Sequence, residues 1–442
     1  MPQISIFTDY QHITRSRLNG KSPLAIGGSF GAGFLHGHER TREVVLAQLD
    51  GGALRVLHAT LGAALALEPD PDHEQLVRLF RGAGDLPRAV HHAAAAARAA
   101  HDAGQYDRAA ELLLRAAELG PADASRFHVE RAGALTRAGR GRAAAEAYLS
   151  ARTGAGEHAA LEYAAAAATL LLTSGHLEAG RRVLGESFAA AGLAPPIRGT
   201  LGNLWRRSKL AVRGLQWTER PSAEIPRAAL VRVDLLRAAA LGAMVTDIGT
   251  AGDFQSRHLL LALETGEPVR VGRALALAAS HAIYTEPGGE ARAGVLLAEA
   301  RRLATRLGDG ETAFLADLAA LVIPVLAGDL HAALARSEAL AGSPHADLAI
   351  SHARAHFHAL RTLFALGRFP ILTQRVPPLL ASASERDDRC VLVWLHGLDV
   401  WLRLADNDLD LEYLVVHGRR GGSAVTVAAV NALCGTDGRT GG

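Results

Sequence analysis

The segment HDAGQYDRAA, residues 101–110, places a short turn at Gly104 between two alanine-rich apolar runs. Two imperfect copies of this turn follow along the chain, TRAGRGRAAA at residues 136–145 and LTSGHLEAGR at residues 172–181. Glycine adopts the left-handed backbone conformation without a side-chain penalty, so it suits a helix that must stop and reverse. The repeated turn therefore predicts that the chain folds back on itself as helix hairpins.

The turns recur at a regular interval. Gly104, Gly139 and Gly175 are separated by 35 and 36 residues. A second series has separations of 39, 39 and 40 residues and consists of Gly289, Gly328, Gly367 and Asn407. Both intervals are typical of helix hairpins that stack into a solenoid. The predicted fold class is therefore all-α, an α-solenoid of antiparallel helix hairpins.

The residues that follow the first three turns fit closely packed hairpins. Five residues after each glycine stands a small residue, which lets the second helix approach the first: Ala109, Ala144 and Gly180. Four residues later, one helical turn further on, comes a larger side chain: Leu113, Tyr148 and Leu184. These larger side chains are predicted to fill the space between neighbouring hairpins.

This pattern resembles the tetratricopeptide repeat (TPR) family. In the first repeat five residues fall at the family's spacing: Tyr106, Ala109, Leu113, Ala116 and Pro121. The first helix departs from the family, because it has alanines where the family prefers a large aromatic residue, leucine, glycine and tyrosine: Ala93, Ala96, Ala97 and Ala100. The repeats are TPR-like rather than regular members.

A wider resemblance appears when the flanking segments are included. Residues 34–65 contain HERTRE followed by LRVLH, where large bacterial signalling proteins of the STAND ATPase type have HDRIRE and LRALH. LVRLFRGAGDLPRAVHHAAAAA, residues 76–97, is similar to the bridge from that ATPase module into helical repeats, and GDFQSRH at 252–258 and GEP at 266–268 recur in the same family. The resemblance covers about residues 34–412. It implies the C-terminal helical region of a bacterial serine/threonine protein kinase fused to a STAND-type ATPase and repeats.

The composition argues against a nucleic-acid partner. Hydrophobic residues make up 49% of the chain but aromatic residues only 5%, which favours closely packed helices. The chain carries 47 Lys+Arg against 45 Asp+Glu, a formal net charge of +2, so no basic face for phosphates is indicated. No helix-turn-helix with a basic recognition helix follows the repeats.

Cysteine usage and hydropathy favour a cytoplasmic protein without membrane contact. Two cysteines, Cys390 and Cys434, are too few for a disulfide framework or an unaided zinc site. The first residues lack the pattern of a secretory signal. The long apolar run at residues 314–327 contains Asp317 and falls short of the roughly 18 residues that a membrane span needs.

Phosphate-binding and kinase motifs are incomplete. NGKS, residues 19–22, has the end of a phosphate-binding loop, but Arg15 occupies the first-glycine position and no helix pattern follows Lys21. The glycine-rich segment 27–34 misses the kinase spacing, and no HRD or DFG triplet occurs. We therefore assign no catalytic, cofactor-binding or metal-binding residues, and the protein is predicted to be non-enzymatic with no cofactor.

Two further segments admit a functional and a structural interpretation. His352 and His356 lie four residues apart on an expected helix and could face one metal ion, with His345 or His358 as a distant third ligand. No glutamate lies between them that could act as a base, so a metallopeptidase site is not supported. A structural or surface role is favoured. The basic amphipathic segment 204–217 could bind an anionic membrane or a partner. The favoured alternative is a connecting helix that buries Trp205 and Trp217 between two helical arrays.

The organisation follows from these patterns. We predict an irregular N-terminus, the end of an ATPase-associated helical module, a first TPR-like array, a connecting segment, a second TPR-like array and a glycine-rich tail: residues 1–37, 38–83, 84–193, 194–227, 228–412 and 413–442. The tail is interpreted either as disordered or as a change of reading frame, and both ends look truncated relative to the family.

The predicted function is a non-enzymatic, TPR-like protein-interaction scaffold in bacterial signal transduction. A peptide or another protein domain is expected to bind the concave surface of the arrays, and a kinase or an ATPase is among the candidate partners. The alternative is an accessory or truncated regulatory part of a serine/threonine protein kinase and ATPase system that acts with a separately encoded catalytic chain.

Overall fold

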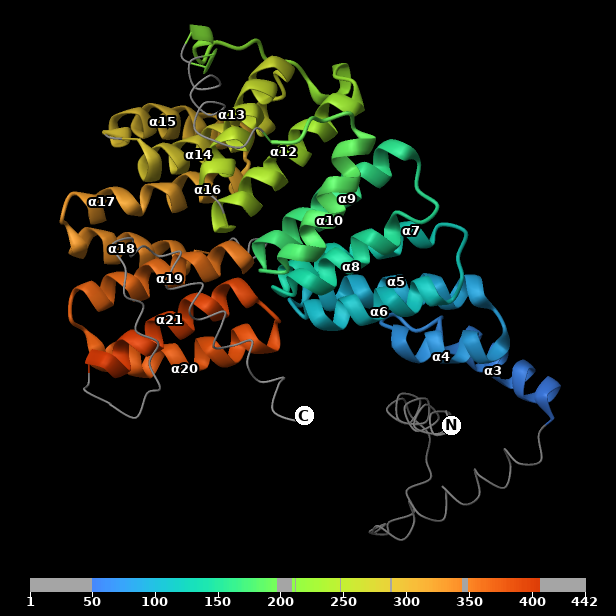
Figure 1. Ribbon diagram of the computed structural model, residues 1–442. Coiled ribbons are helices and arrows are strands. Elements are labelled where there is room, and N and C mark those ends of the chain that lie inside the picture. Colours follow the sequence, from blue (N-terminus) through green and yellow to red (C-terminus); the bar gives the residue numbers. More distant parts are fainter. Residues whose placement is uncertain are drawn as a thin grey trace, which may run out of the picture. The chain divides into compact units, whose positions relative to one another are not determined.

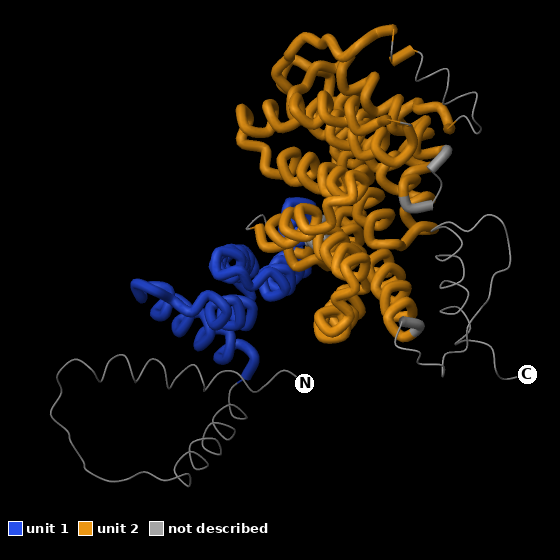
Figure 2. The backbone as a smooth tube through the Cα atoms, turned by 90° about the vertical axis from the view of Figure 1, so that its left-hand side faces the viewer, with its two compact units in different colours: residues 1–134 blue, residues 135–442 orange. Residues whose placement is uncertain are grey.

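The computed structural model describes residues 50–196, 209–210, 212–246, 248–286, 288–343 and 349–405. Within these ranges all regular secondary structure is helical (Figure 1). The all-α prediction is therefore confirmed for the described part of the chain. The chain divides into two compact units, residues 1–134 and 135–442 (Figure 2).

In the first unit α3, α4, α5 and α6 each pack on the next helix along the chain. Its helices are α3 Gly51–Leu65, α4 His73–Ala83, α5 Leu86–Asp102, α6 Tyr106–Glu118 and most of α7 Ala124–Arg137. Asp50, Asp72 and Asp85 cap the first three helices, because each carboxylate accepts a hydrogen bond from a backbone N–H that has no partner inside its helix.

The hairpin of α5 and α6 turns where the sequence predicts. Gly104 has a φ of 73°, in the left-handed region, and the alanines on both helices are buried. Ala93, Ala97 and Ala109 have 0%, 2% and 0% of their surface exposed. The short side chains let the two helices approach closely, so alanine replaces the larger TPR residues without leaving the core open.

The second unit continues the hairpins. Its helices are α8 Gly141–Ala151, α9 Glu157–Thr173, α10 Leu177–Ala190, α12 Arg227–Thr246, α13 Ile248–Thr265, α14 Pro268–Thr285, α15 Gly289–Leu307, α16 Gly310–Ala320, α17 Val322–Leu326, α18 Leu330–Ala341, α19 Ala349–Ala365, α20 Phe369–Glu385 and α21 Arg389–Ala405. A 3-10 turn, η1 Ser222–Glu224, precedes α12.

Most of the predicted turn glycines are confirmed, and one is wrong. Gly139, Gly175, Gly328 and Gly367 have φ values of 74°, 84°, 78° and 68°, and a helix ends before each of them. At the PGGEA turn, however, the left-handed residue is Gly288, whereas Gly289 is the first residue of α15.

Gly289 is glycine for a different reason. A Cβ atom there would lie 2.2 Å from the carbonyl oxygen of Ala282 in α14, so only glycine allows this close approach. In a Gly-Gly pair the sequence pattern cannot tell the left-handed residue from the closely packed one. Asn407, the last member of the series, lies outside the described residues.

The helices of the second unit form two rows. Neighbouring members of the row α9, α12, α14, α16, α19 and α21 contact one another. In the described part of the chain, the intervening helices α10, α13, α15, α18 and α20 make no comparable contacts among themselves. Because the helices of one row are closer together, the stack bends with that row on the inside, and we call it the inner row. These alternating hairpins form an α-solenoid.

The larger residues after the turns pack as predicted. Leu113 is 5% exposed, the Tyr148 ring stacks on Tyr163 of α9 with ring centroids 6.1 Å apart, and Leu184 packs against a core cluster that includes residues of α12. The small residue Gly180 is also confirmed, because a Cβ atom there would lie 2.6 Å from Cγ of Leu172. Leu172 therefore fills a space that glycine keeps open.

The connecting segment packs against the second array. Trp217 and Leu215 are partly buried against a cluster formed by α13, α14 and α15, and the backbone N–H of Arg220 donates to the carbonyl oxygen of Gly266 at 2.8 Å. A Cβ atom at Gly266 would lie 2.2 Å from the Thr218 carbonyl oxygen. Trp205 lies outside the described residues, so its predicted burial stays a prediction.

Candidate functional site

A surface pocket opens beside the C-terminal ends of the inner-row helices α14 and α19. It has a volume of about 460 Å³, and we call it the edge pocket. Its lining residues come from the C-terminal ends of α14, α17 and α19 and the start of α18: Ile283, Tyr284, Val322, Val325, Leu326, Leu330, Arg361, Thr362 and Ala365. The pocket is thus apolar, with a single charged side chain.

A break in one helix supplies part of this pocket. α16 ends at Ala320, and the short helix α17 begins at Val322. Pro324 has no N–H to donate to the carbonyl of residue 320, and its ring would clash with that carbonyl in a continuous helix. The chain bends at Leu321 for this reason, and Val322, Val325 and Leu326 of α17 face the same hollow as residues of α14 and α19.

The edge pocket leaves apolar surface accessible. Tyr284 is 49% exposed and Leu326 is 54% exposed, although both are large hydrophobic residues. Single exposed hydrophobic residues are common, but two that line one concave surface are typical of a binding site. This surface is the strongest candidate for contact with a partner.

Arg361 gives the edge pocket its charge. Its guanidinium donates a hydrogen bond to the Tyr284 hydroxyl, and partial enclosure raises the pKa of Tyr284 while Arg361 opposes that rise. Burial, followed by the nearby charges of Arg361 and Arg354, lowers the pKa of His358 to about 4. Among the described residues no carboxylate forms an ion pair with Arg361. The charge of the pocket is therefore positive.

A second hollow of about 380 Å³ lies between α19, α20 and α21. Phe357, Leu379 and Leu395 form apolar parts of its wall, and Arg386 and His356 contribute polar groups. His356 thus lies in a cavity wall. His345 and the side chain of His352 lie outside the described residues, so the proposed pairing of His352 with His356 is not tested.

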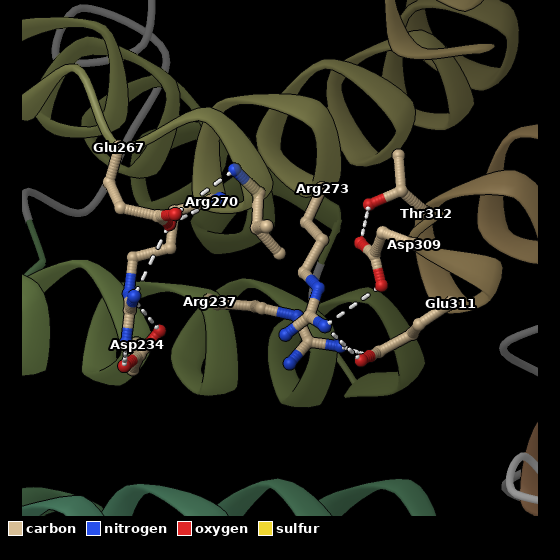
Figure 3. A network of polar contacts seen from close by, with 9 residues as sticks. Asp234, Arg237, Glu267, Arg270, Arg273, Asp309, Glu311 and Thr312 are labelled. Carbon is tan, nitrogen blue, oxygen red and sulfur yellow. Dashed lines mark hydrogen bonds and ion pairs between the residues drawn. The ribbon is translucent and has the colours of Figure 1, made fainter. Parts of the chain in front are cut away.

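Charged side chains on α12, α14 and α16 form a partly buried network, which we call the ionic layer (Figure 3). It consists of Asp234, Arg237, Glu267, Arg270, Arg273, Asp309, Glu311 and Thr312. Nε and Nη2 of Arg270 donate to Oδ1 and Oδ2 of Asp234 at 2.9 and 2.6 Å. The Glu311 carboxylate forms ion pairs with both Arg237 and Arg273. Nη2 of Arg273 lies 2.7 Å from Oε2 of Glu311.

Two carboxylates of the ionic layer, those of Asp309 and Glu311, have lowered pKa values. Burial acts to raise the pKa of Glu311, but the charges of Arg237 and Arg273 outweigh it, so the pKa lies below the ordinary value. Burial likewise opposes ionisation of Asp309, whereas a hydrogen bond from Thr312 and the charge of Arg273 lower the pKa of Asp309 overall. These ion pairs join three inner-row helices, although the buried Nε of Arg273 has no hydrogen-bond partner among the described residues.

Two turns that are distant in sequence meet within the second unit, and we call their contact the turn clasp. The backbone N–H of Arg389, after α20, donates to the carbonyl oxygen of Ser174, after α9, at 3.0 Å. Nε2 of His176 lies 3.1 Å from the carbonyl oxygen of Asp387, and Arg140 donates to the carbonyl oxygen of Glu385 at 2.8 Å. The bend of the stack thus brings its last described hairpin back to α8, α9 and α10.

Gly175 makes the turn clasp possible. A Cβ atom at this position would lie 2.7 Å from the backbone nitrogen of Cys390 and 2.9 Å from Cβ of Arg389. Cys390 itself is buried, and burial raises the pKa of its thiol to about 11, so the thiol stays protonated and unreactive near neutral pH.

The described residues offer neither a metal site nor a membrane-spanning helix. No group of three or more His, Cys, Asp or Glu in the described ranges could hold a metal ion. Nδ1 of His73 and Nδ1 of His92 lie 3.1 Å apart, and burial, followed by the charges of His73 and His91, lowers the pKa of His92. No described helix is both long enough and apolar enough to cross a membrane. Lys21, the NGKS segment and the glycine-rich segment 27–34 lie outside the described residues.

Sequence reasoning missed the ionic layer, although a signal was present. Asp234 and Arg270 are 36 residues apart, as are Arg273 and Asp309. This separation matches the turn interval of the first series and is shorter than the 39–40 residues predicted for the second, so opposite charges about one repeat apart were a signal for ion pairs between successive inner-row helices. The edge pocket had a weaker signal in Pro324, which lies inside an apolar run.

Comparison with known proteins gives distant similarities. No family model matches the chain, and no curated protein matches it. A STAND protein with a tetratricopeptide repeat sensor from Pyrococcus horikoshii aligns at 12% identity and a TM-score of 0.38, over 82% of this chain and 55% of that one. The Rap conjugation gene regulator of plasmid pLS20, in complex with the Phr* peptide, aligns at 10% identity and a TM-score of 0.36, over 80% of this chain and 92% of that one. The chain thus spans about half the length of the STAND protein.

Proposed function

We propose that the protein is a non-enzymatic scaffold that binds a peptide or a segment of another protein through its inner row of helices. The observation that carries this proposal is the edge pocket, an apolar hollow with exposed Tyr284 and Leu326 beside the inner-row helices α14 and α19. Stacked helix hairpins present extended surfaces of this kind to binding partners.

The proposal extends to signal transduction in the bacterial cytoplasm. The HERTRE and LRVLH motifs of residues 38–58, which resemble the end of a STAND-type ATPase module, support a role beside a kinase or ATPase. A second candidate function, an accessory part that docks onto a separately encoded catalytic chain, rests on the same motifs. Co-purification of a chain that carries phosphate-binding and kinase motifs would favour this second function over a free-standing scaffold.

Binding by the full chain tests the scaffold function directly. A random peptide library displayed on phage is selected on the immobilised protein, and we expect enrichment of specific peptides. Leu326→Asp should abolish their binding, because it places a charge in the apolar pocket. Val295→Asp is the matched control, since Val295 is 62% exposed and lies on α15 away from the pocket.

Catalytic assays provide the complementary test. The purified chain is expected to show no ATP hydrolysis and no phosphate transfer to a general protein substrate. Turnover that disappears in Lys21→Ala would overturn the non-enzymatic assignment. Failure of the library to yield any peptide above the Leu326→Asp background would overturn the binding function.

A further inference from the structure

We infer that the edge pocket selects a peptide segment in which a large apolar side chain stands next to a single carboxylate, and that Arg361 binds this carboxylate. This inference rests on the proposed function and names the chemistry of the partner. The apolar side chain of the peptide would occupy the hollow between α14, α17 and α19. The carboxylate of the peptide would bind the Arg361 guanidinium in the wall of that hollow.

The size of the pocket leaves room for a large apolar side chain. Pockets that hold small ligands span roughly 300–1,000 Å³, and the edge pocket, at about 460 Å³, lies near the lower end. Val325, Leu326 and Leu330 offer aliphatic walls, and the Tyr284 ring adds a flat apolar face. A leucine, isoleucine, methionine or phenylalanine side chain is therefore the expected occupant rather than a polar one.

The charge of the pocket favours an anion at one position. Arg361 is the single charged residue of the lining, and its present partner is a neutral hydroxyl, that of Tyr284. Arg354 is close enough to affect His358 together with Arg361, so the surroundings of this guanidinium are also positive. A partner carboxylate would form a charge-assisted hydrogen bond here, which is stronger than the hydrogen bond to the hydroxyl.

The rest of the rim does not favour further negative charge. α14 ends at Thr285, α17 at Leu326 and α19 at Ala365, so three helix C-termini meet at this edge. Their terminal carbonyl groups carry partial negative charge and accept hydrogen bonds. They would repel a run of acids. One carboxylate beside one apolar anchor is therefore preferred over a polyacidic segment or a phosphate.

The experiment measures binding of a synthetic peptide taken from the library selection to the full chain by fluorescence anisotropy. Arg361→Gln should weaken binding of a peptide with a single acid next to the apolar anchor by tenfold or more. The same variant should change binding of the amide version of that peptide, with Asn or Gln in place of the acid, by less than threefold. Arg336→Gln, an exposed position on α18 outside the pocket, is the matched control and should leave both affinities unchanged.

Each outcome separates this inference from the proposed function. In one outcome the selected peptides bind both Leu326→Asp and Arg361→Gln as tightly as they bind the parent protein. That result would overturn the inference and would mean that the scaffold binds its peptides at another surface. Peptides that lose affinity with Leu326→Asp but prefer phosphate or several acids at Arg361 would also overturn it. Absence of any selected peptide would instead count against the scaffold function. Far-ultraviolet circular dichroism of each variant confirms that the helices are retained.

Discussion

The first and second helical arrays use the same turn but different cores. In the first array α5 and α6 meet through buried alanines, and the ion pair between Arg108 and Glu74 is about one-third exposed. In the second array the ionic layer is more deeply placed, with side chains between 7% and 27% exposed, and the main cluster combines leucines, valines and an isoleucine with alanines. Small side chains bring helices close and leave little room for anything else. Larger side chains, buried charges and the bend at Pro324 give the second array its register and its edge pocket.

The largest expected difference appears on acidification. His258 in α13 is fully buried, neither ring nitrogen has a hydrogen-bond partner, and burial lowers its pKa from 6.5 to about 3, with a smaller effect of Arg237. The folded state therefore keeps His258 neutral, whereas the unfolded state takes up a proton below pH 6.5. Stability of the second array is lost as the pH falls from 6.5 towards 3, by about 3 kcal/mol at pH 4.5.

Urea unfolding at pH 7 and pH 4.5 measures this loss. All four tryptophans lie after residue 200, so tryptophan fluorescence follows the second unit. His258→Leu should be as stable as the parent or more stable at pH 7, because it removes an unpaired polar ring, and it should lose much less stability at pH 4.5. An unchanged loss in this variant would assign the acid sensitivity to other groups, such as the carboxylates of the ionic layer.

The next effect tests whether the ionic layer holds the inner row in register. Glu311→Gln leaves Arg237 and Arg273 without their shared carboxylate, and we expect a loss of about 2–3 kcal/mol in the free energy of unfolding. Asp317→Asn on the same helix is the control. Its ion pair with Arg301 is about half exposed, so its removal should cost less than about 1 kcal/mol. Equal losses in the two variants would show that the buried ion pairs of Glu311 contribute no more to the free energy of unfolding than the exposed pair of Asp317.

A third test concerns the place where the two arrays touch. Gly175 and Gly154 have similar φ values of 84° and 86°, but a Cβ atom would meet the backbone of Cys390 only at Gly175 and finds open space at Gly154. Alanine at either position is strained by roughly 1–2 kcal/mol. Gly175→Ala should cost about 2 kcal/mol more than Gly154→Ala in urea unfolding, because the turn clasp must open or shift. Similar costs would mean that the clasp does not contribute to stability.

The smallest effects test close packing in the first array. Gly180→Ala in α10 would crowd Leu172 and should destabilise by about 1 kcal/mol, the net of overpacking and better helix propensity. Gly185→Ala in the same helix meets nothing within 4 Å and should stabilise by up to about 1 kcal/mol. Thermal unfolding followed by circular dichroism compares the two. Stabilisation by both substitutions would contradict the close approach of α9 and α10.

Local rules explain which features the sequence could predict. Gly104, Gly139, Gly175, Gly328 and Gly367 each end a helix in the left-handed conformation, and that requirement acts on one residue at a time. The choice between Gly288 and Gly289 failed because both are glycine and only the distance to Ala282 distinguishes their roles. Local patterns therefore place turns to within a residue.

The features that depend on distant residues were not predicted. The turn clasp joins His176 to Asp387, 211 residues away, and its position depends on the summed bend of every hairpin between them. The edge pocket depends on how far α17 leans after Pro324 and on which side chains of α14 and α19 then stay exposed. Neither quantity is encoded in one segment, although Pro324 signals the break and the 36-residue spacing of opposite charges signals the ionic layer.

Hydrogen–deuterium exchange of the full chain, with and without a library-selected peptide, tests the central claim most directly. The account predicts added protection of α17, the start of α18 and the last turns of α14 and α19, with no change in α5 and α6. Added protection centred on the alanine-packed helices of the first array, or none anywhere at saturating peptide, would contradict it.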